Sequence, residues 1–188
     1  MEVMTEKSAE KFLALNGFEV IKTEFVSREE DLKNVLKGFH YPVVLKVSGN
    51  SIVHKSVIGG VKKNIHNHEM ALKAFKILKK ISGAEGVLIQ EQIKEEEYLV
   101  GLKKTPEFGY VLVFGKGGPS VEKEGKVNFR VCGVDGMNDL SNDKRVREIF
   151  RKLCNLTEIY PRIQELDINP LILRNGKAQI VDARVVLA

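Results

Sequence analysis

Residues suited to metal binding lie near the C-terminal end of the chain. The string Glu165-Leu-Asp-Ile-Asn169-Pro170 is followed, after an Asn175-Gly176 dipeptide, by Asp182. Asn-Gly is a strong hairpin turn, so antiparallel pairing through it would bring Asn169 close to Asp182. Two hard oxygen ligands side by side suit Mg²⁺, which keeps several waters and shares its coordination sphere with substrate phosphates. The alternative is structural: an Asx turn at Asn169-Pro170 and a salt bridge between Asp182 and Arg184.

A second group of residues could bind an anion. Lys46 ends the apolar run that starts at Tyr41, and Lys55 is followed by Gly59-Gly60. A strand lysine can neutralise phosphate oxygens, and a glycine loop can point its backbone N–H groups at the same anion. Taken alone, a surface lysine and an ordinary glycine turn explain these residues equally well. His54, beside Lys55, would by itself be read as a surface or packing histidine.

A third segment, Phe114-Gly-Lys-Gly-Gly118, would let a backbone approach a ligand, although a short glycine-rich turn is a weak signal.

The net charge of +5 raises the question of nucleic-acid binding. The excess is local, because seven lysines and one acid lie between His54 and Lys80. Aromatic residues make up only 7%, there is no Trp, and no RNA-binding motif is present. A small polyphosphate ligand therefore explains the basic segment better than a nucleic acid does, although much of it can be a solvated helix face.

Composition places the chain among globular proteins. It has 188 residues, 43% hydrophobic and 29% charged, and no apolar run of the roughly 20 residues that span a bilayer. The start is acidic and lacks the apolar core of a signal peptide. Cys132 and Cys154 form no CxxC motif, so we expect two thiols in a reducing cytoplasm rather than a disulfide framework or a zinc ribbon.

Hydrophobic periodicity predicts the elements that must position these residues. Helices are expected over 5–15, from a capping box at Ser27 and Glu30 to Gly38, after an Asn67 cap over 70–78, and over 143–160. Strands are expected over 43–47, 87–91, 98–102, 110–114, 166–173 and 178–181. Helices and strands do not alternate strictly, which indicates two α+β lobes with a boundary near 86–94 rather than a parallel sheet.

The combination and order of these segments resemble one family. The strings Tyr41-Pro-Val-Val-Leu-Lys46, His54-Lys-Ser56 and Gly59-Gly-Val61 are similar to the first lobe of the ATP-grasp domain in ADP-forming acetyl-CoA and acyl-CoA synthetases. The pattern continues through the segments that follow, nearly to Leu187. These segments are Gln90-Glu91, Glu97-Tyr-Leu-Val-Gly101, Pro106-Glu-Phe-Gly109, Phe114-Gly-Lys-Gly-Gly118 and Glu165-Leu-Asp-Ile-Asn-Pro-Leu171.

The resemblance implies an α+β ATP-grasp fold with lobes 1–88 and 89–188 and with ATP or ADP between two antiparallel sheets. It assigns Glu91 and Ile93 to the segment that meets adenine, and Glu97 to the side of the ribose. Phosphates would be held by Lys46, Lys55, Gly59 and Gly60, and Mg²⁺ by Asn169 and Asp182.

The resemblance also implies a reaction and a partner. His54 matches a histidine that carries a phosphoryl group between the nucleotide site and a phosphohistidine of the CoA-binding subunit. The family reaction is acyl-CoA + ADP + phosphate ⇌ carboxylic acid + CoA + ATP. A neutral imidazole nitrogen is a competent nucleophile near pH 7. No CoA-binding region fits in the 188 residues, so a separate CoA-binding (alpha) subunit and a hetero-oligomer are expected, without nucleic acid or membrane.

One departure from the family pattern bears on activity. After Phe129-Arg130 the family has a longer stretch with a second glycine-rich segment, and about twenty residues are missing here before the helix expected at 143. A non-catalytic or regulatory nucleotide-binding subunit is therefore one alternative. A succinyl-CoA synthetase beta subunit is another, against which the His54-Lys55-Ser56 string argues.

Overall fold

The computed structural model describes residues 1–49, 52, 55, 57–117, 127–133 and 141–188. In these residues the helices are α1 (Glu6–Leu15), α2 (Glu29–Leu36), α3 (His68–Leu78) and α5 (Lys144–Ile159). The strands are β1 (Glu2–Val3), β2 (Thr23–Val26), β3 (Val43–Ser48), β4 (Val61–Ile65), β5 (Gly86–Glu91), β6 (Glu97–Thr105), β7 (Gly109–Lys116), β8 (Val127–Val131), β9 (Ile163–Arg174), β10 (Lys177–Ile180) and β11 (Ala183–Leu187).

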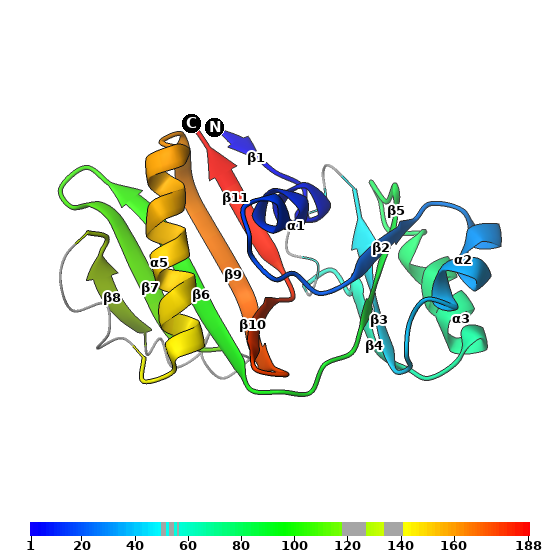
Figure 1. The fold of residues 1–188 in the computed structure, drawn as a ribbon. Coiled ribbons are helices and arrows are strands. Elements are labelled where there is room, and N and C mark those ends of the chain that lie inside the picture. The colour runs from blue at the N-terminus through cyan, green and yellow to red at the C-terminus, as the bar shows by residue number, and fades with distance from the viewer. Residues whose placement is uncertain (50–51, 53–54, 56, 118–126, 134–140) are drawn as a thin grey trace. The chain divides into compact units, whose positions relative to one another are not determined.

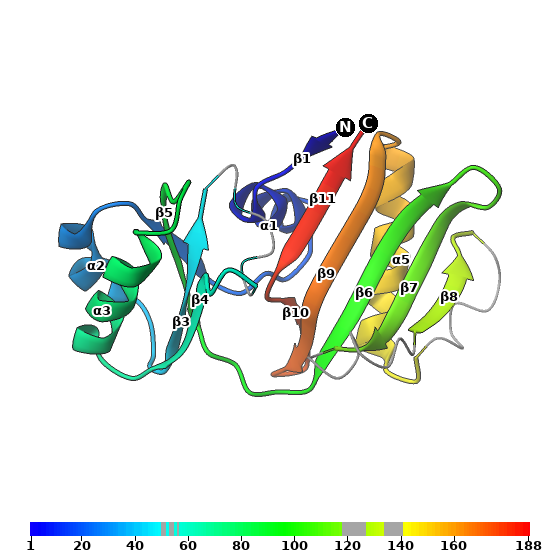
Figure 2. The ribbon, with the colours of Figure 1, turned by 180° about the vertical axis from the view of Figure 1, so that it is seen from behind.

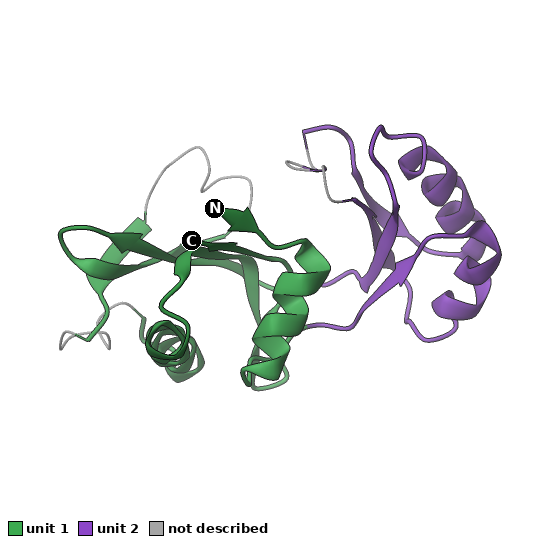
Figure 3. Ribbon diagram, turned by 90° about the horizontal axis from the view of Figure 1, so that it is seen from above, with its two compact units in different colours: residues 1–20, 95–188 green, residues 21–94 purple. Residues whose placement is uncertain are grey.

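The chain forms two compact units, coloured separately in Figure 3. Unit 1 comprises residues 1–20 and 95–188, and unit 2 comprises residues 21–94. This division differs from the predicted lobes 1–88 and 89–188, because the first twenty residues belong to unit 1. The reason is long-range packing: Val3 pairs with Val186 across β1 and β11, and α1 contributes Ala9 and Leu13 to the unit 1 core.

Unit 1 is built on a sheet with the strand order β1-β11-β9-β6-β7-β8, with β10 paired to β9. All of its strand pairs are antiparallel. Helices α1 and α5 lie on one face (Figure 1), and in the view from behind no described helix stands in front of the other face (Figure 2). Alternate strand residues such as Leu166 and Ile168 pack with Phe150 and Leu153 of α5 in one core. We call the opposite face of this sheet the open face.

Unit 2 has a four-stranded antiparallel sheet in the order β2-β5-β3-β4. Helices α2 and α3 supply Leu32, Phe75 and Leu78 to its core, together with Val43 and Leu45 of β3. Because side chains alternate along a strand, Val44 and Lys46 of β3 point to the sheet face opposite these helices. The predicted α+β class is confirmed in both units.

Local sequence signals were right at two points and wrong at one. The Asn67 side chain accepts a hydrogen bond from the Met70 N–H at 2.9 Å and caps α3 as predicted. Asn175 and Gly176 have φ of 51° and 74° and join β9 to β10 as the predicted hairpin. The predicted capping box at Ser27 and Glu30 is absent: α2 starts after Arg28, which makes no side-chain cap hydrogen bond, and three acids in the first turn favour the helix dipole instead.

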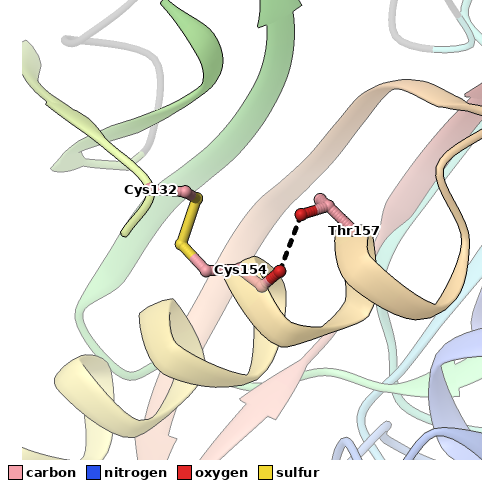
Figure 4. The surroundings of a disulfide bond; sticks show 3 residues. All are labelled: Cys132, Cys154 and Thr157. Atoms are coloured by element: carbon pink, nitrogen blue, oxygen red, sulfur yellow. Dashed lines mark hydrogen bonds between the residues drawn. A yellow bond between two sulfur atoms is a disulfide. The ribbon is translucent and has the colours of Figure 1, made fainter. Parts of the chain in front are cut away.

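The expectation of two free thiols is wrong. Cys132 and Cys154 form a disulfide with their Cα atoms 5.5 Å apart (Figure 4). The Cys132 N–H donates to the Tyr110 carbonyl, which fixes Cys132 on the helix-covered face at the end of β8, opposite α5. The spacing of 22 residues carried no sign of this tertiary juxtaposition. The cysteines therefore give no argument for a reducing compartment.

Among the residues that the structure describes, no helix has the length and apolar character needed to cross a membrane.

Candidate functional site

The predicted metal ligands lie next to each other in unit 1. Ala183 pairs with Ile168 and Ile180 pairs with Leu171, so the same register places Asn169 opposite Asp182. The Asn169 N–H donates to the Asp182 carbonyl at 3.1 Å. Directly opposite residues of an antiparallel pair have Cβ atoms about 5 Å apart on one face of the sheet. The juxtaposition inferred from the Asn175-Gly176 turn is thus present.

A β-bulge lies at this position. On the other side of β9, Tyr98 pairs with Leu171 and Val100 with Ile168, so Leu99 faces both Asn169 and Pro170. Bulges of this kind re-aim side chains and are frequent beside active sites. Asn169 is exposed and Asp182 half-buried, and both can reach a ligand on the open face. No group of three or more His, Cys, Asp or Glu side chains in the described residues could hold a metal alone. Asn169 and Asp182 therefore fit a Mg²⁺ ion that takes its other ligands from water and phosphate.

Asp167 is a site residue that the sequence did not single out. It shares the open face with Glu165 and Asn169, because Leu166 and Ile168 point into the core. Burial, and then the Glu165 carboxyl, raise the pKa of Asp167 to about 6. A Cβ on the facing Gly101 would lie 3.2 Å from its Oδ1, so glycine leaves room for this carboxyl. The alternation of two acids and an amide, Glu165, Asp167 and Asn169, with apolar residues was the available signal.

Arg184 does not have the partner proposed for it in the structural alternative. Its Nη1 lies 2.9 Å from a Glu165 carboxylate oxygen and 3.9 Å from Asp167. The guanidinium lowers the pKa of Asp167 against the larger effect of burial. The positive charge of Arg184 therefore partly offsets the negative charges of Glu165 and Asp167 on the open face, beside the Asn169–Asp182 pair.

Glu97 and the glycine-rich turn are also brought together in unit 1. Glu97 begins β6, and its carbonyl accepts a hydrogen bond from the Gly117 N–H at 2.6 Å. A Cβ on Gly117 would lie 2.8 Å from the Glu97 carbonyl carbon, so only glycine allows this approach. Gly117, the last described residue of the Phe114–Gly118 segment, thus packs against the backbone of Glu97, the predicted ribose contact.

The phosphate candidates of unit 2 meet at the end of β3. Lys46 pairs with Val61 of β4 and Leu88 of β5 and is only 7% exposed. The Val47 N–H donates to the Gly60 carbonyl at 2.8 Å, and the Gly60 N–H donates to the Lys55 carbonyl at 2.7 Å. These two hydrogen bonds fold the Lys55–Gly60 turn back onto the strand that carries Lys46.

The two glycines of that turn have different roles. Gly59 has φ of 69° with open space around it, a conformation that favours glycine or asparagine. A Cβ on Gly60 would lie 2.6 Å from Val47 Cγ1 and 2.9 Å from the Lys55 carbonyl oxygen, so a side chain cannot fit there. The turn is thus specified by both the backbone conformation of Gly59 and the lack of space at Gly60. His54 lies outside the described residues, and its predicted role stays a prediction.

The predicted adenine segment follows β5. The Glu91 carboxylate accepts a hydrogen bond from the His40 backbone N–H at 3.2 Å and lies 3.0 Å from His40 Nδ1. The Glu91 side chain therefore holds the segment that leads into β3. The side chain of the next residue, Gln92, accepts a hydrogen bond from the Asn64 backbone N–H and donates one to the Asn64 side-chain oxygen. Ile93 follows without strand structure and is half-buried. The Gln92 N–H donates to the Pro42 carbonyl at 2.9 Å, so the backbone from Ile93 onward is the part of the segment suited to contact a base edge.

Two α+β units with antiparallel sheets and this arrangement of candidate residues define an ATP-grasp type of protein. The model of the ATP-grasp domain family matches residues 1–141 and 131–187, and the chain belongs to that family.

The relatives of known sequence have more specific names than the family. The chain is 31% identical to the beta subunit of acetate–CoA ligase (ADP-forming) I of Pyrococcus furiosus, over 98% of this chain and 91% of the relative. It is 33% identical to acetate–CoA ligase (ADP-forming) II of Archaeoglobus fulgidus, over 98% of this chain but only 30% of that longer protein.

Solved structures agree with this relationship. A dinucleotide-forming acetyl-coenzyme A synthetase 1 of Ca. Korarchaeum cryptofilum, in complex with coenzyme A and Ca-AMPCP, matches with a TM-score of 0.90 at 27% identity, over 100% of this chain and 94% of that one. A second structure of that protein holds Mg-AMPPCP, with a phosphohistidine segment pointing towards the nucleotide-binding site. It matches with a TM-score of 0.81 at 27% identity, over 99% and 93% of the two chains.

The shortened region noted in the sequence reappears in these comparisons. The family model matches in two pieces that meet at residues 131–141, directly after β8. The alignment with the Pyrococcus subunit spans 212 positions, whereas the chain has 188 residues. Relatives therefore carry residues that this chain lacks.

Proposed function

We propose that this chain is the nucleotide-binding subunit of an ADP-forming acyl-CoA synthetase and works with a separate CoA-binding subunit. The observation that carries the proposal is the alignment with the Pyrococcus beta subunit, which covers nearly the full length of both chains. In the Archaeoglobus relative the same region is only 30% of the protein, so the remaining steps belong to sequence outside it. The proposed reaction is acyl-CoA + ADP + phosphate ⇌ carboxylic acid + CoA + ATP.

In this proposal residues of both units have roles in nucleotide binding. Lys46, Lys55, Gly59 and Gly60 hold phosphate oxygens through cations and backbone N–H groups. Glu91 and Ile93 contact adenine, and Glu97 contacts the ribose. The buried position of Lys46 supports its role, because an ammonium group withdrawn from water interacts more strongly with an anion.

Asn169 and Asp182 would hold Mg²⁺ in the proposed site. When bound, the ion would neutralise charge on the phosphates. The two residues fit this role because they are opposite each other beside a bulge and present oxygen atoms on the open face. The solved structure of the Korarchaeum protein with Mg-AMPPCP supports magnesium as the metal.

His54 would carry the phosphoryl group between the subunits. Its neutral imidazole nitrogen attacks phosphorus, so a P–N bond forms to His54 while the P–N bond of the partner's phosphohistidine breaks. A terminal oxygen of ADP then attacks the same phosphorus, so the P–O bond of ATP forms while the P–N bond to His54 breaks and the imidazole leaves in its neutral state. The phosphohistidine segment in the Korarchaeum relative supports this role.

The decisive experiment reconstitutes the chain with a CoA-binding subunit. ATP formation from acyl-CoA, ADP and phosphate should require both chains, and turnover by the isolated chain would exclude the proposed division of labour. His54→Asn should keep nucleotide binding, abolish turnover and remove acid-labile, base-stable phosphate from this chain. His66→Asn, at an exposed histidine in the same unit, is the matched control and should retain turnover.

A second function is favoured by the shortened region after β8. A regulatory ATP-grasp subunit would bind Mg-nucleotide through the same residues but lack turnover with any CoA-binding partner. Nucleotide binding without phosphorylation of His54 in the reconstituted complex would select this alternative.

A further inference from the structure

The β8 end of the unit 1 sheet carries an apolar surface outside the candidate nucleotide site. Strand β8 is last in the sheet order of the described residues, with β7 on one side. Phe108 and Phe129 are 64% and 56% exposed there. A pocket of about 410 Å³ lies at this edge. It is lined by Phe108, Val111, Phe129, Arg130 and Val131.

The apolar residues of β8 share one face. Phe129 pairs with Val113 and Val131 with Val111, and opposite residues of antiparallel strands point to the same side. Arg130 pairs with Leu112, which is buried in the core under α5, so Arg130 points to the helix-covered side. The open face of β8 is therefore entirely apolar.

The backbone of β8 is also suited to pairing. The Cys132 N–H donates to the Tyr110 carbonyl, and hydrogen-bonded and non-hydrogen-bonded pairs alternate along an antiparallel ladder. The N–H and C=O groups of Phe129 and Val131 therefore point away from β7. The Phe129 carbonyl oxygen accepts a hydrogen bond from Arg130 Nη1 at 2.9 Å, which agrees with this outward direction. The second lone pair of the carbonyl oxygen can accept a hydrogen bond from another donor.

We propose that β8 pairs with β8 of a second copy of this chain to form a two-fold symmetric dimer. The sequence of the strand fits itself in one antiparallel register, centred on Phe129. That register places Phe129 opposite its own copy, Val127 opposite Val131, and Asn128 opposite Arg130. It uses all five residues of the strand, keeps the apolar face continuous and puts no like charges opposite each other.

Neighbouring registers are worse for stated reasons. A shift to a centre on Arg130 would place two guanidinium groups directly opposite each other, which is unfavourable. A slip by one residue would put Phe129 opposite Asn128 and mix the apolar face with the polar one. An exposed apolar edge strand is a template for pairing with another chain, and the self-complementary pattern selects a second copy as that chain.

The shortened region is consistent with this edge being available. The two matches of the family model meet at residues 131–141, immediately after β8. The positions that relatives have and this chain lacks would therefore follow this strand. Fewer residues remain here to cover the edge within one chain.

The first test measures the mass of the full chain by sedimentation equilibrium across a wide range of concentration. We expect a dimer for the wild type and a monomer for Phe129→Glu, whose paired carboxylates would face each other at the centre. Leu15→Glu, at a 77% exposed leucine on α1, is the matched control and should remain dimeric. Thermal unfolding establishes that both variants are folded. A wild-type monomer, or a dimer that Phe129→Glu leaves intact, overturns the proposal.

The second test checks the register by cross-linking. Under mild oxidation a mixture of Asn128→Cys and Arg130→Cys chains should yield a 128–130 intermolecular disulfide, identified by peptide mass spectrometry. Each variant alone should not cross-link at the new cysteine. A 130–130 link would contradict the register. The same mass measurement with the CoA-binding subunit present has a further outcome: if the partner binds at β8 and the chain is otherwise monomeric, the surface is a hetero-interface and the proposal fails. None of these readouts uses catalysis, so the dimer stands or falls independently of the proposed function.

Discussion

Asn169 lies directly opposite Asp182 across the junction of β10 and β11, and its N–H donates to the Asp182 carbonyl at 3.1 Å. The two oxygen-bearing side chains are thus positioned by backbone pairing rather than by a flexible loop. A change in either side chain should alter ligand binding while the strand pairing persists.

We expect Asn169→Ala and Asp182→Ala to lose the magnesium-dependent part of nucleotide stabilisation. Mg-ADP bound only to the folded state raises the free energy of unfolding by RT ln(1 + [L]/Kd), about 2.7 kcal/mol at a hundredfold excess over Kd. Thermal shift with ADP, with and without Mg²⁺, measures this quantity. Asn34→Ala on α2 is the control. If both site variants keep the full metal-dependent shift, the magnesium assignment is wrong.

The disulfide should contribute measurably to stability. Closing a loop of 22 residues between Cys132 and Cys154 restricts the unfolded chain by about 3 kcal/mol in the chain-entropy model. The double variant Cys132→Ser and Cys154→Ser should therefore unfold at lower denaturant concentration. Reductant should destabilise the wild type by a similar amount and leave the variant unchanged. Equal stability of reduced and oxidised wild type would contradict the predicted stabilisation by the disulfide.

Asp143 should give α5 a stability that depends on acid pH. Its carboxylate caps the helix by accepting a hydrogen bond from the Arg145 backbone N–H at 2.8 Å, and it accepts a second one from Arg145 Nε at 2.9 Å. The Arg145 side chain, against the opposing effect of burial, lowers the pKa of Asp143 from 3.8 to about 2. Because the pKa is lowered on folding, the contribution is complete above pH 3.8 and is lost as the pH falls towards 2.

Asp143→Ala should accordingly cost about 1 kcal/mol at neutral pH, the usual effect of losing an N-cap side chain. Denaturant unfolding across the acid range should show the difference from wild type narrowing between pH 3.8 and 2. Asn142→Ala, one residue before the cap, is the control. A difference that stays constant through this range would exclude the ionic contribution.

Gly60 should not tolerate a side chain, whereas its neighbour should accept one. Ala at 60 would force Val47 or the Lys55 carbonyl to move, and overpacking of this kind costs about 1–3 kcal/mol. Because the displaced turn lies beside Lys46, nucleotide affinity should fall as well. Gly59→Asn is the matched comparison, since asparagine accepts positive φ and the space there is open. Isothermal titration and unfolding curves measure both effects. Equal stability of the two variants would refute the steric argument.

Local sequence patterns predicted the elements that carry strong periodicity. Helix α5 and the hairpin at Asn175-Gly176 follow directly from apolar spacing and turn chemistry. Strand β4 was missed because Lys62, Lys63 and Asn64 interrupt its apolar pattern, as its mostly accessible side chains allow. Strand β8 was missed for a similar reason, since an edge strand with exposed residues lacks a buried alternation.

The candidate site divides in the same way. The Asn169–Asp182 pairing could be predicted because a short turn fixes its register. The approach of Gly117 to Glu97 likewise continues the β6–β7 hairpin, in which Tyr98 pairs with Lys116. The disulfide between Cys132 and Cys154 could not be predicted, because it depends on tertiary packing that no short turn fixes. Contacts between side chains could be predicted from the sequence where a short turn joins the two segments, and not where tertiary packing brings them together.

The interrupted sequence of unit 1 sets an order for its assembly during synthesis. All strands of the unit 2 sheet lie between Thr23 and Glu91, so this unit can close while the second half of the chain is still being translated. Strand β1 has no place to pair until its partner β11, which ends at Leu187, leaves the ribosome. The residues of β1 and α1 are therefore made before unit 2, but they reach their final pairing only after β11 has been made.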